Sequence, residues 1–194
     1  MNQKFDSRKA EKRLREVFMN LEIKRELNVT RKQIRKEVNY ASIKQIQKER
    51  LENLPKAQAF KAELIKLFPE LRFEARLKSL YSIFGKILKH RTTADAFGIN
   101  VVTETEEACY GFYEWAAKQY TAYDLDDRIK NPKPNGYRDL KFIICYEDFL
   151  IEFIVQTQSM YIDARTLQAH ELVYPWKYHD VLKNLPAEYQ AIKF

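Results

Sequence analysis

The sequence predicts an α+β (α/β) fold with a helical N-terminal extension, on the basis of spacing and composition. Apolar residues recur at helical spacing before residue 70, whereas segments rich in β-branched and aromatic residues alternate with helical segments after residue 90. Hydrophobic residues make up 45% of the 194 residues and aromatic residues 13%. The chain can therefore bury a core, and wholesale disorder is excluded.

Three helices are expected in the first 70 residues, over positions 6–20, 30–54 and 56–68. Thr30 fits the N-cap position of the second helix. Pro55 is expected to separate the second helix from the third, because proline lacks the N–H that a helix interior needs. The second helix has few apolar residues for its length, which predicts a largely solvated helix.

Strands and helices alternate in the rest of the chain. The expected elements, in order, are a helix over Leu77–Lys89, a strand over Phe97–Thr103, a helix over Thr105–Tyr120, a polar loop over Asp124–Gly136, a hairpin of Leu140–Tyr146 with Phe149–Thr157, and a helix over Ser159–Val173. An irregular tail follows the last helix.

Positive charge is concentrated in the first third of the chain. Residues 1–70 contain 18 Lys and Arg against 10 Asp and Glu, whereas residues 71–194 contain 16 against 17, so surpluses of +8 and −1 give the formal +7. This shift predicts a basic helical extension over residues 1–70 and a separate domain with a short tail over residues 71–194. The surplus suits an acidic partner such as nucleic acid, but ordinary solvation of amphipathic helices also explains it.

The sequence contains no targeting or membrane-spanning signal. No window of about 18 apolar residues is present, and the polar first residues lack the apolar stretch of a secretory signal. Cys109 and Cys145 lie in apolar segments without metal-binding spacing, so both are expected to be reduced core residues. We therefore expect a cytoplasmic protein without a membrane partner.

Basic and hydroxyl side chains recur every four residues near the start of the predicted helix at Leu77–Lys89. Lys78, Ser82 and Lys86 would project from one helix face, where two ammonium groups flank a hydroxyl. Such a face suits a polyphosphate, because cations neutralise phosphoryl charge. An ordinary solvated basic face is the alternative interpretation.

Two carboxylates are associated with predicted strands. Asp95 lies just before the strand at Phe97–Thr103, and Glu152 lies inside the otherwise apolar segment Ile151–Val155. A carboxylate there should face solvent, pair or bind a metal, and two of them on neighbouring strands could share one Mg²⁺. Simple alternation of Glu152 to a wet sheet face explains it as well.

The loop at residues 129–138 combines stiffness, an aromatic residue and positive charge. Two prolines restrict it, and Asn135-Gly136 permits a tight turn. Tyr137 is expected to protrude, and it is accompanied by the cations Lys130, Lys133 and Arg138. Such a loop suits a purine nucleotide, with a platform for the base and cations for the phosphates, although a solvated hairpin turn fits equally.

Taken together and in order, these segments resemble the synthetase domain of RelA/SpoT-type alarmone synthetases, including its small stand-alone members and toxin relatives. The resemblance covers about residues 72–174. It rests on R-x-K-x-x-x-S-I-x-x-K at Arg76–Lys86, D-x-x-G at Asp95–Gly98, D-x-I-x-x-P-K-x-N-G-Y at Asp127–Tyr137, E-x-x-x-x-T at Glu152–Thr157, and Gln168-Ala169-His170.

The resemblance implies a nucleotidyltransferase-like fold, a mixed sheet flanked by helices, that moves the β,γ-pyrophosphate of ATP to the 3′-hydroxyl of GDP or GTP. It implies ATP binding by Arg76, Lys78, Ser82 and Lys86, with Arg76 against the adenine. It implies that Asp95 and Glu152 are catalytic and hold Mg²⁺, with Glu152 activating the hydroxyl. It implies acceptor binding by Tyr137, Lys130, Lys133, Asn135, Arg138 and His170.

Several positions depart from the family pattern. Asn100 replaces an arginine expected against the adenine, and Ile154 and Gln156 replace polar groups near the acceptor. Asp139 and Lys141 stand where a serine and a histidine are expected. These changes leave two alternatives: a toxin-like enzyme acting on the tRNA 3′ end, with tRNA held by the basic helices, or a catalytically silent nucleotide-binding regulatory module. A homo-oligomer or an antitoxin partner is also compatible with the resemblance.

Overall fold

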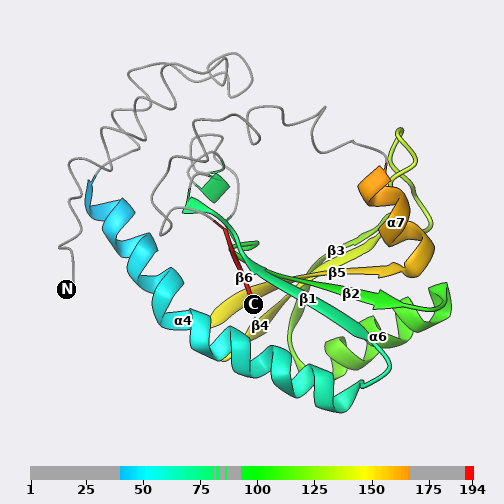
Figure 1. The fold of residues 1–194 in the computed structure, drawn as a ribbon, viewed down its shortest axis with the longest axis horizontal. Helices are drawn as coiled ribbons and strands as arrows, with labels where there is room; N and C mark the ends of the chain where they lie inside the picture. The colour runs from blue at the N-terminus through cyan, green and yellow to red at the C-terminus, as the bar shows by residue number, and fades with distance from the viewer. Residues whose placement is uncertain (1–39, 81, 84–85, 87–92, 167–190) are drawn as a thin grey trace.

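The structure is a computed structural model that describes residues 40–80, 82–83, 86, 93–166 and 191–194 (Figure 1). Its elements are α4 (Tyr40–Leu67), β1 (Arg72–Leu77), β2 (Phe97–Thr103), α6 (Glu106–Gln119), β3 (Ala122–Asp127), β4 (Leu140–Tyr146), β5 (Phe149–Thr157), α7 (Gln158–Thr166) and β6 (Ile192–Lys193). The expected mixed sheet flanked by helices, an α+β architecture, is confirmed.

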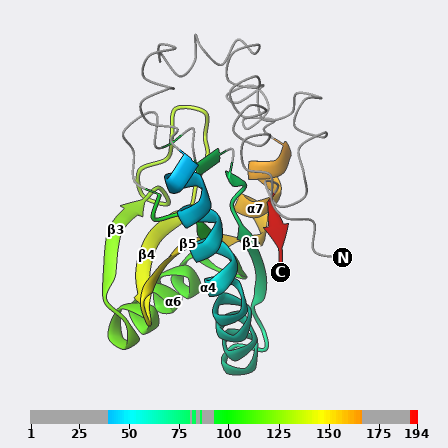
Figure 2. The same cartoon turned by 90° about the vertical axis from the view of Figure 1, so that its left-hand side faces the viewer.

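The six strands form one sheet in the order β3-β4-β5-β2-β1-β6. Strands β2 and β5 are parallel, and the other neighbouring pairs are antiparallel. Figure 2 shows β3 and β6 at opposite edges of this sheet. Residues that are far apart in the chain, on β1, β2 and β5, therefore meet at its centre.

The two faces of the sheet differ in character. On one face, Phe153 of β5 packs against Phe60 of α4 and Phe112 of α6, with ring centroids 6.3 and 5.3 Å apart. Alternate residues of β1, β2 and β5 point to the other side, which we call the open face. Figure 1 shows α4 and α6 on the same side of the sheet and α7 on the other.

Helix α4 corrects the prediction of a break at Pro55, because the proline lies inside one continuous helix. Proline removes the hydrogen bond to the carbonyl of Leu51, and its ring crowds that carbonyl. Both residues are exposed, so the carbonyl can tilt outward and bind water. Ala57, Phe60 and Leu64 are buried in the same core as the sheet. This packing outweighs the local cost of the proline, and the helix is not a purely solvated one.

The predicted start of a helix at Leu77 is wrong, because this residue belongs to strand β1. The segment RFEARL is a strand in which buried and more exposed positions alternate, and Leu77 is its last residue. Lys78 follows the strand, and helical residues begin at Leu80. The segment is short enough to fit either a helix or a strand, and the pairing of all six of its residues with β2 determines the strand.

The remaining predictions were mostly accurate where the structure describes them. The strands at Phe97–Thr103, Leu140–Tyr146 and Phe149–Thr157 are confirmed, as is α6, with Thr105 as its N-cap and Tyr120 as its C-cap. The predicted polar loop is wrong in its first part, which belongs to β3. The predicted helix at 6–20, the start of the one at 30–54 and the end of the one at Ser159–Val173 lie outside the described residues.

The described residues also bear on the membrane and cysteine predictions. None of the described helices has the length and apolar character required to cross a bilayer. Cys109 is buried and Cys145 half-buried, and both are free thiols.

Candidate functional site

A row of residues in cross-strand register crosses the centre of the open face. Arg76 of β1 lies opposite Gly98 of β2, and Gly98 lies beside Glu152 of β5. Directly opposed residues on neighbouring strands project to the same side of a sheet. The arginine and the carboxylate predicted from the sequence therefore share one face, on either side of a glycine.

Gly98 leaves space between these two side chains. A Cβ atom at this position would lie 3.8 Å from Cγ and Nε of Arg76 and 4.0 Å from the carbonyl oxygen of Glu152. The arginine side chain thus lies alongside the glycine backbone. This arrangement lets a ligand approach the sheet more closely than a larger residue would permit.

Two lysines converge on Asp95 at the start of β2. Nζ of Lys78 and Nζ of Lys86 both donate to Oδ2 of Asp95, whose side chain is 7% exposed. Burial alone would raise the pKa of Asp95, but the two lysines outweigh it and hold the pKa below its ordinary value of 3.8. Burial lowers the pKa of Lys78, although the charge of Asp95 opposes that shift. The predicted cationic cluster exists, with a carboxylate at its centre.

The way in which this cluster forms differs from the prediction. Lys78 precedes the helical residues, so it does not share a helix face with Ser82 and Lys86. The Ser82 hydroxyl accepts a hydrogen bond from the hydroxyl of Ser79 at 3.0 Å, and Ser79 Oγ accepts one from the Ser82 backbone N–H. Ser82 is therefore engaged with the start of its own helix.

Arg50 of α4 contacts the backbone at the lysine cluster, and no sequence pattern predicted this contact. Its side chain is buried, and Nε donates to the carbonyl oxygen of Lys78 at 3.2 Å. Nη1 donates to Oε1 of Gln47 at 3.3 Å. Burial lowers the pKa of Arg50 to about 10, so the guanidinium stays charged at neutral pH. The extension thus fixes the backbone that carries Lys78.

Asp95 has a carboxylate oxygen available for a further partner. Its Oδ1 atom is buried and has no hydrogen-bond partner in the described part of the chain. A buried, unpartnered carboxylate oxygen is costly, and carboxylate oxygens are the protein ligands that Mg²⁺ prefers. Asp95 lies three residues before Gly98, the register partner of Glu152. The residues present therefore fit a divalent cation at this end of β2 and β5.

Glu152 also faces a lysine. Oε1 of Glu152 lies 3.7 Å from Nζ of Lys141, which is on β4 at a position opposite Ile154. Each of the two predicted metal carboxylates is thus paired with lysine in this structure. Among the described residues, no group of three or more His, Cys, Asp or Glu side chains forms a metal site. Any cation bound here would rely on the two carboxylates together with substrate oxygens.

The predicted protrusion of Tyr137 is wrong, because its hydroxyl is tied to the protein. Tyr137 is half-buried, and Oη donates to Oδ2 of Asp139 at 2.8 Å. Asp139 is fully buried and also pairs with Arg128 at 3.1 Å. Burial together with the charge of Asp139 raises the pKa of Tyr137, so the phenol stays protonated. Lys133 Nζ lies 5.2 Å from the centre of the Tyr137 ring.

The other loop residues divide between the turn and the body of the protein. Asn135 Oδ1 accepts from the Tyr137 N–H at 3.2 Å, and Gly136 has φ +79, which confirms the tight turn. Lys130 Nζ pairs with Asp127 at 3.4 Å and lies 4.7 Å from the Tyr110 ring. Arg138 pairs with Glu106 of α6. Lys133 is the loop cation associated with Tyr137, whereas Lys130 and Arg138 are held by other acids.

A cluster under α7 was not found from the sequence. Tyr161 donates through Oη to Glu74 of β1 at 2.6 Å, and its ring has Arg72 and Arg165 at 4.4 and 4.1 Å. Arg165 also pairs with Glu74 at 3.0 Å. These contacts hold α7 against one end of the open face. Alternating charges in RFEARL were the only available signal.

The departures from the family pattern lie on the same face. Asn100 is half-buried and in register with Ile154 and with Glu74. Gln156 is buried, and its Nε2 donates to the carbonyl oxygen of Arg138 at 2.8 Å. Gln156 thus binds the backbone of the segment that precedes β4. His170 lies outside the described residues.

Comparisons with known proteins show to which family the chain is similar. A family model described as "Region found in RelA / SpoT proteins" matches residues 75–179. The chain is 34% identical over 113 residues to the probable GTP diphosphokinase RSH2, chloroplastic, of Oryza sativa subsp. japonica, covering 54% of this chain and 15% of the relative. It is 28% identical over 133 residues to the GTP pyrophosphokinase of Escherichia coli strain K12, covering 64% and 16%. The chain thus spans about a sixth of the length of these relatives.

Solved structures share the fold. The small alarmone synthetase 2 of Bacillus subtilis is 20% identical, with a TM-score of 0.56 over 73% of this chain and 84% of the other. The small alarmone synthetase 1 of Bacillus subtilis, bound to its product pppGpp, is 23% identical, with a TM-score of 0.53 over 68% and 84%. These likenesses establish the architecture of the sheet and its helices.

Proposed function

Because the chain belongs to the family defined by the region found in RelA and SpoT proteins, we propose that it is an ATP-dependent pyrophosphokinase. The β,γ-pyrophosphate of ATP moves to the 3′-hydroxyl of GDP or GTP. A bond forms between the 3′-oxygen and the β-phosphorus, the bond between the α,β-bridging oxygen and the β-phosphorus breaks, and AMP leaves. The product is a (p)ppGpp-type alarmone.

One observation carries this proposal: the row Arg76, Gly98 and Glu152 lies next to the lysines that converge on Asp95. Phosphoryl transfer requires positioning and charge neutralisation more than covalent chemistry by the protein. Lys78 and Lys86 supply the positive charge that the donor phosphates need, and Arg76, which lies alongside Gly98, can stack on the adenine. Gly98 lets the nucleotide approach the sheet between the arginine and the carboxylate.

Glu152 is the group that accepts the proton of the attacking hydroxyl. It is buried in an apolar strand yet projects onto the open face, so it can reach a ligand without leaving the sheet. Asp95 and Glu152 would together hold Mg²⁺, in keeping with the unpartnered Oδ1 atom of Asp95. When bound, the metal supplies neutralisation of the donor phosphate charge. Lys141 holds Glu152 in place on the side of β4.

The loop after β3 supports binding of the acceptor. Because Asp139 holds the Tyr137 hydroxyl, the ring has a fixed plane against which a guanine base can stack. Lys133 lies near that ring and can reach the acceptor phosphates. The names of the relatives, GTP diphosphokinase and GTP pyrophosphokinase, support a free guanosine nucleotide over the tRNA 3′ end.

The test is product formation from labelled ATP and Mg²⁺ with GDP, GTP or tRNA in parallel, resolved by mass spectrometry. We expect pyrophosphate transfer to GDP or GTP. We expect Glu152→Gln to abolish transfer while ATP binding persists, because the amide keeps the size of the side chain but not its basicity. Glu114→Gln, an exposed position on α6, is the matched control.

Two results would contradict the proposal. If folded wild-type protein transfers pyrophosphate to neither GDP nor GTP, the activity is not the one proposed. If Glu152→Gln turns over at the wild-type rate, Glu152 is not the proton acceptor.

A further inference from the structure

Two polar residues occupy the buried side of α4. Buried positions recur along this helix every three, four or seven residues, which is the spacing of one helix face: Gln47, Arg50, Ala57, Phe60 and Leu64. The last three pack in the core, so the helix turns the polar pair inward as well. The Arg50 side chain is 2% exposed. Burying a guanidinium is costly unless its N–H groups are bonded, so its contacts indicate why it is kept.

Arg50 makes one of these contacts with the residue that links β1 to the lysine cluster. Nε of Arg50 donates to the carbonyl oxygen of Lys78 at 3.2 Å, across 28 residues of sequence. The N–H of Lys78 donates to the carbonyl oxygen of Ala96 at 2.7 Å. Ala96 follows Asp95, whose carboxylate accepts from Nζ of Lys78. Both backbone polar groups of Lys78 are therefore bonded, one to the segment before β2 and the other to α4.

These two backbone bonds set the direction of the Lys78 side chain. The N–H and C=O groups of a residue lie on either side of its Cα atom, so fixing both restricts φ and ψ and hence the direction of the Cα–Cβ bond. Lys78 is the first residue after β1, so its carbonyl lies beyond the pairing of β1 with β2. The contact from Arg50 restrains this carbonyl where the strand pairing ends.

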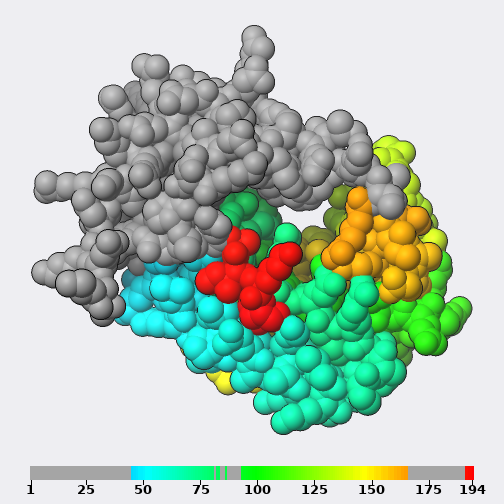
Figure 3. All heavy atoms as spheres, in the orientation of Figure 1, coloured from blue at the N-terminus to red at the C-terminus, as the bar shows by residue number. Residues whose placement is uncertain are grey.

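Gln47 holds Arg50 in the orientation that this contact requires. Oε1 of Gln47 accepts from Nη1 of Arg50 at 3.3 Å, and the two residues are three apart on the helix. Because the guanidinium is planar, bonds at Nε and Nη1 fix its plane. In Figure 3 a hollow in the surface lies between the C-terminal residues (red) and α7 (orange), and the first half of α4 (cyan) lies on the other side of the red residues. Arg50 is buried in a helix outside this hollow, so it can act on a ligand there through Lys78.

We propose that Arg50 is a positioning residue for the donor: its contact with the Lys78 carbonyl holds the Lys78 ammonium group where the phosphates of ATP bind. The inference rests on the proposed function, because it takes Lys78 to bind those phosphates. It makes α4 a functional part of the donor site in addition to its packing on the sheet. Loss of the Arg50 contact should therefore weaken phosphate binding as long as Lys78 is present.

The experiment is a double-mutant cycle between Arg50→Met and Lys78→Met, in which calorimetry gives the Kd for α,β-methylene-ATP and for inorganic tripolyphosphate. Methionine removes the donor of each residue and keeps an unbranched side chain. We expect Lys78→Met to raise both Kd values about ten-fold, the loss of one charge-assisted contact. We expect Arg50→Met to raise them about five-fold in the wild type but less than about two-fold in Lys78→Met, because no ammonium group then remains to be positioned.

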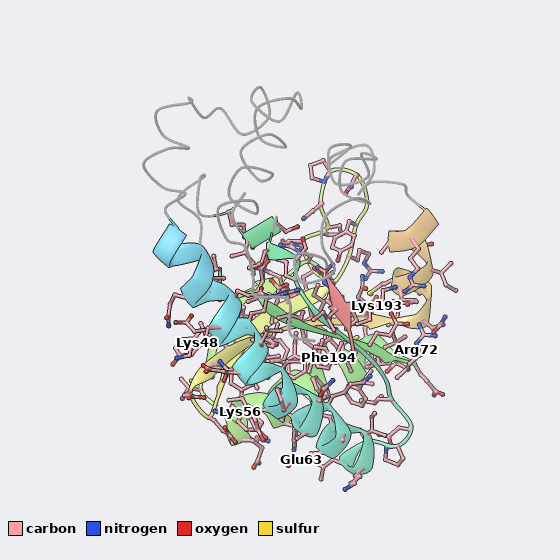
Figure 4. All side chains as sticks on the ribbon, turned by 60° about the vertical axis from the view of Figure 1, so that its left-hand side comes forward. Lys48, Lys56, Glu63, Arg72, Lys193 and Phe194 are labelled. Carbon is pink, nitrogen blue, oxygen red and sulfur yellow. The ribbon has the colours of Figure 1, made fainter. Side chains whose placement is uncertain are left out.

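Arg50→Gln and Lys48→Met are the matched controls. Nε2 of glutamine is separated from Cα by the same number of bonds as Nε of arginine, so Arg50→Gln keeps a donor to Lys78 and loses the charge. We expect its Kd values to stay within about two-fold of wild type. Lys48→Met removes a charge from an exposed position of the same helix (Figure 4) and should also change Kd less than about two-fold, because screening weakens an exposed, distant charge. A thermal melt checks the folding of each variant, and Arg50→Leu replaces Arg50→Met in the cycle if the latter does not fold.

Four results would overturn the inference. The first is wild-type affinity of Arg50→Met for both probes. The second is an equal loss from Arg50→Met with and without Lys78→Met, which indicates general damage to the fold. The third is a loss in Arg50→Gln as large as in Arg50→Met, which indicates an effect of charge and not of the contact. The fourth is wild-type affinity of Lys78→Met, which leaves Arg50 no phosphate-binding group to position.

The two proposals fail in different ways. If the wild type forms product from GDP or GTP and the cycle is additive, the inference is wrong and the activity stands. If the cycle shows the expected coupling but no product forms from GDP or GTP, the proposed function is wrong and Arg50 still positions Lys78 for a polyphosphate.

Discussion

Removal of the negative charge at Asp95 should destabilise the fold even without a substrate. Asp95→Asn leaves Lys78, whose side chain is 11% exposed, without its counter-charge. Breaking a fully buried ion pair by removing one partner costs about 3–5 kcal/mol. Lys86 is 30% exposed and can be partly hydrated, and the asparagine oxygen still accepts one hydrogen bond. We therefore expect a loss of about 2–3 kcal/mol in the free energy of unfolding.

The measurement is urea unfolding of wild type, Asp95→Asn, Lys78→Met and the double variant. The double variant removes both charges, so it should be more stable than the sum of the two single losses predicts. The pKa of Asp95 is lowered in the folded state. Its stabilising contribution is therefore complete above the unfolded pKa, and the gap between wild type and Asp95→Asn should narrow as the pH falls below about 4. Stability of Asp95→Asn within about 0.5 kcal/mol of wild type at pH 7 would refute this reasoning.

Two further predictions concern the scaffold. Phe60→Ala should lower the free energy of unfolding by about 3–5 kcal/mol, because this buried ring packs α4 against the sheet. If urea unfolding shows a loss below about 1 kcal/mol, α4 is not part of the core. Gly136→Ala should cost about 1–2 kcal/mol, since φ is +79 and an added Cβ meets nothing within 4 Å. Gly111→Ala, in the helical backbone of α6, should instead stabilise by up to about 1 kcal/mol, and equal effects of the two substitutions would contradict the backbone argument.

Regular elements were predictable where a single periodicity dominates. The segments FGINVVT and FLIEFIVQT are almost continuously apolar, and Thr105 caps a helix with acidic residues in its first turn. The sequence patterns gave wrong predictions where tertiary packing determines the secondary structure. Pro55 lies on the exposed side of a helix whose other side is buried, and the strand Arg72–Leu77 takes its conformation from pairing with β2.

The site was predictable by residue type more than by geometry. Lys78 and Lys86 meet at Asp95, and Arg76 and Glu152 share one sheet face, but the geometry differs from the prediction, since Arg76 lies on a strand and Lys78 precedes the helix. Tyr137 could not be placed correctly, because the buried Asp139 that holds its hydroxyl is two residues further along and gives no local signal of burial.

Helix α4 contacts three parts of the structure that lie far apart in the sequence. Arg50 donates to the carbonyl oxygen of Lys78, the residue after β1, and Lys61 donates to the carbonyl oxygen of Phe194, the residue after β6. Between them, Phe60 packs against Phe153, the neighbour of Glu152 on β5. A helix that contacts the backbone of Lys78, strand β5 and the residue after β6 restrains all three at once. The extension therefore contributes to the geometry of the open face, whatever else its basic residues bind.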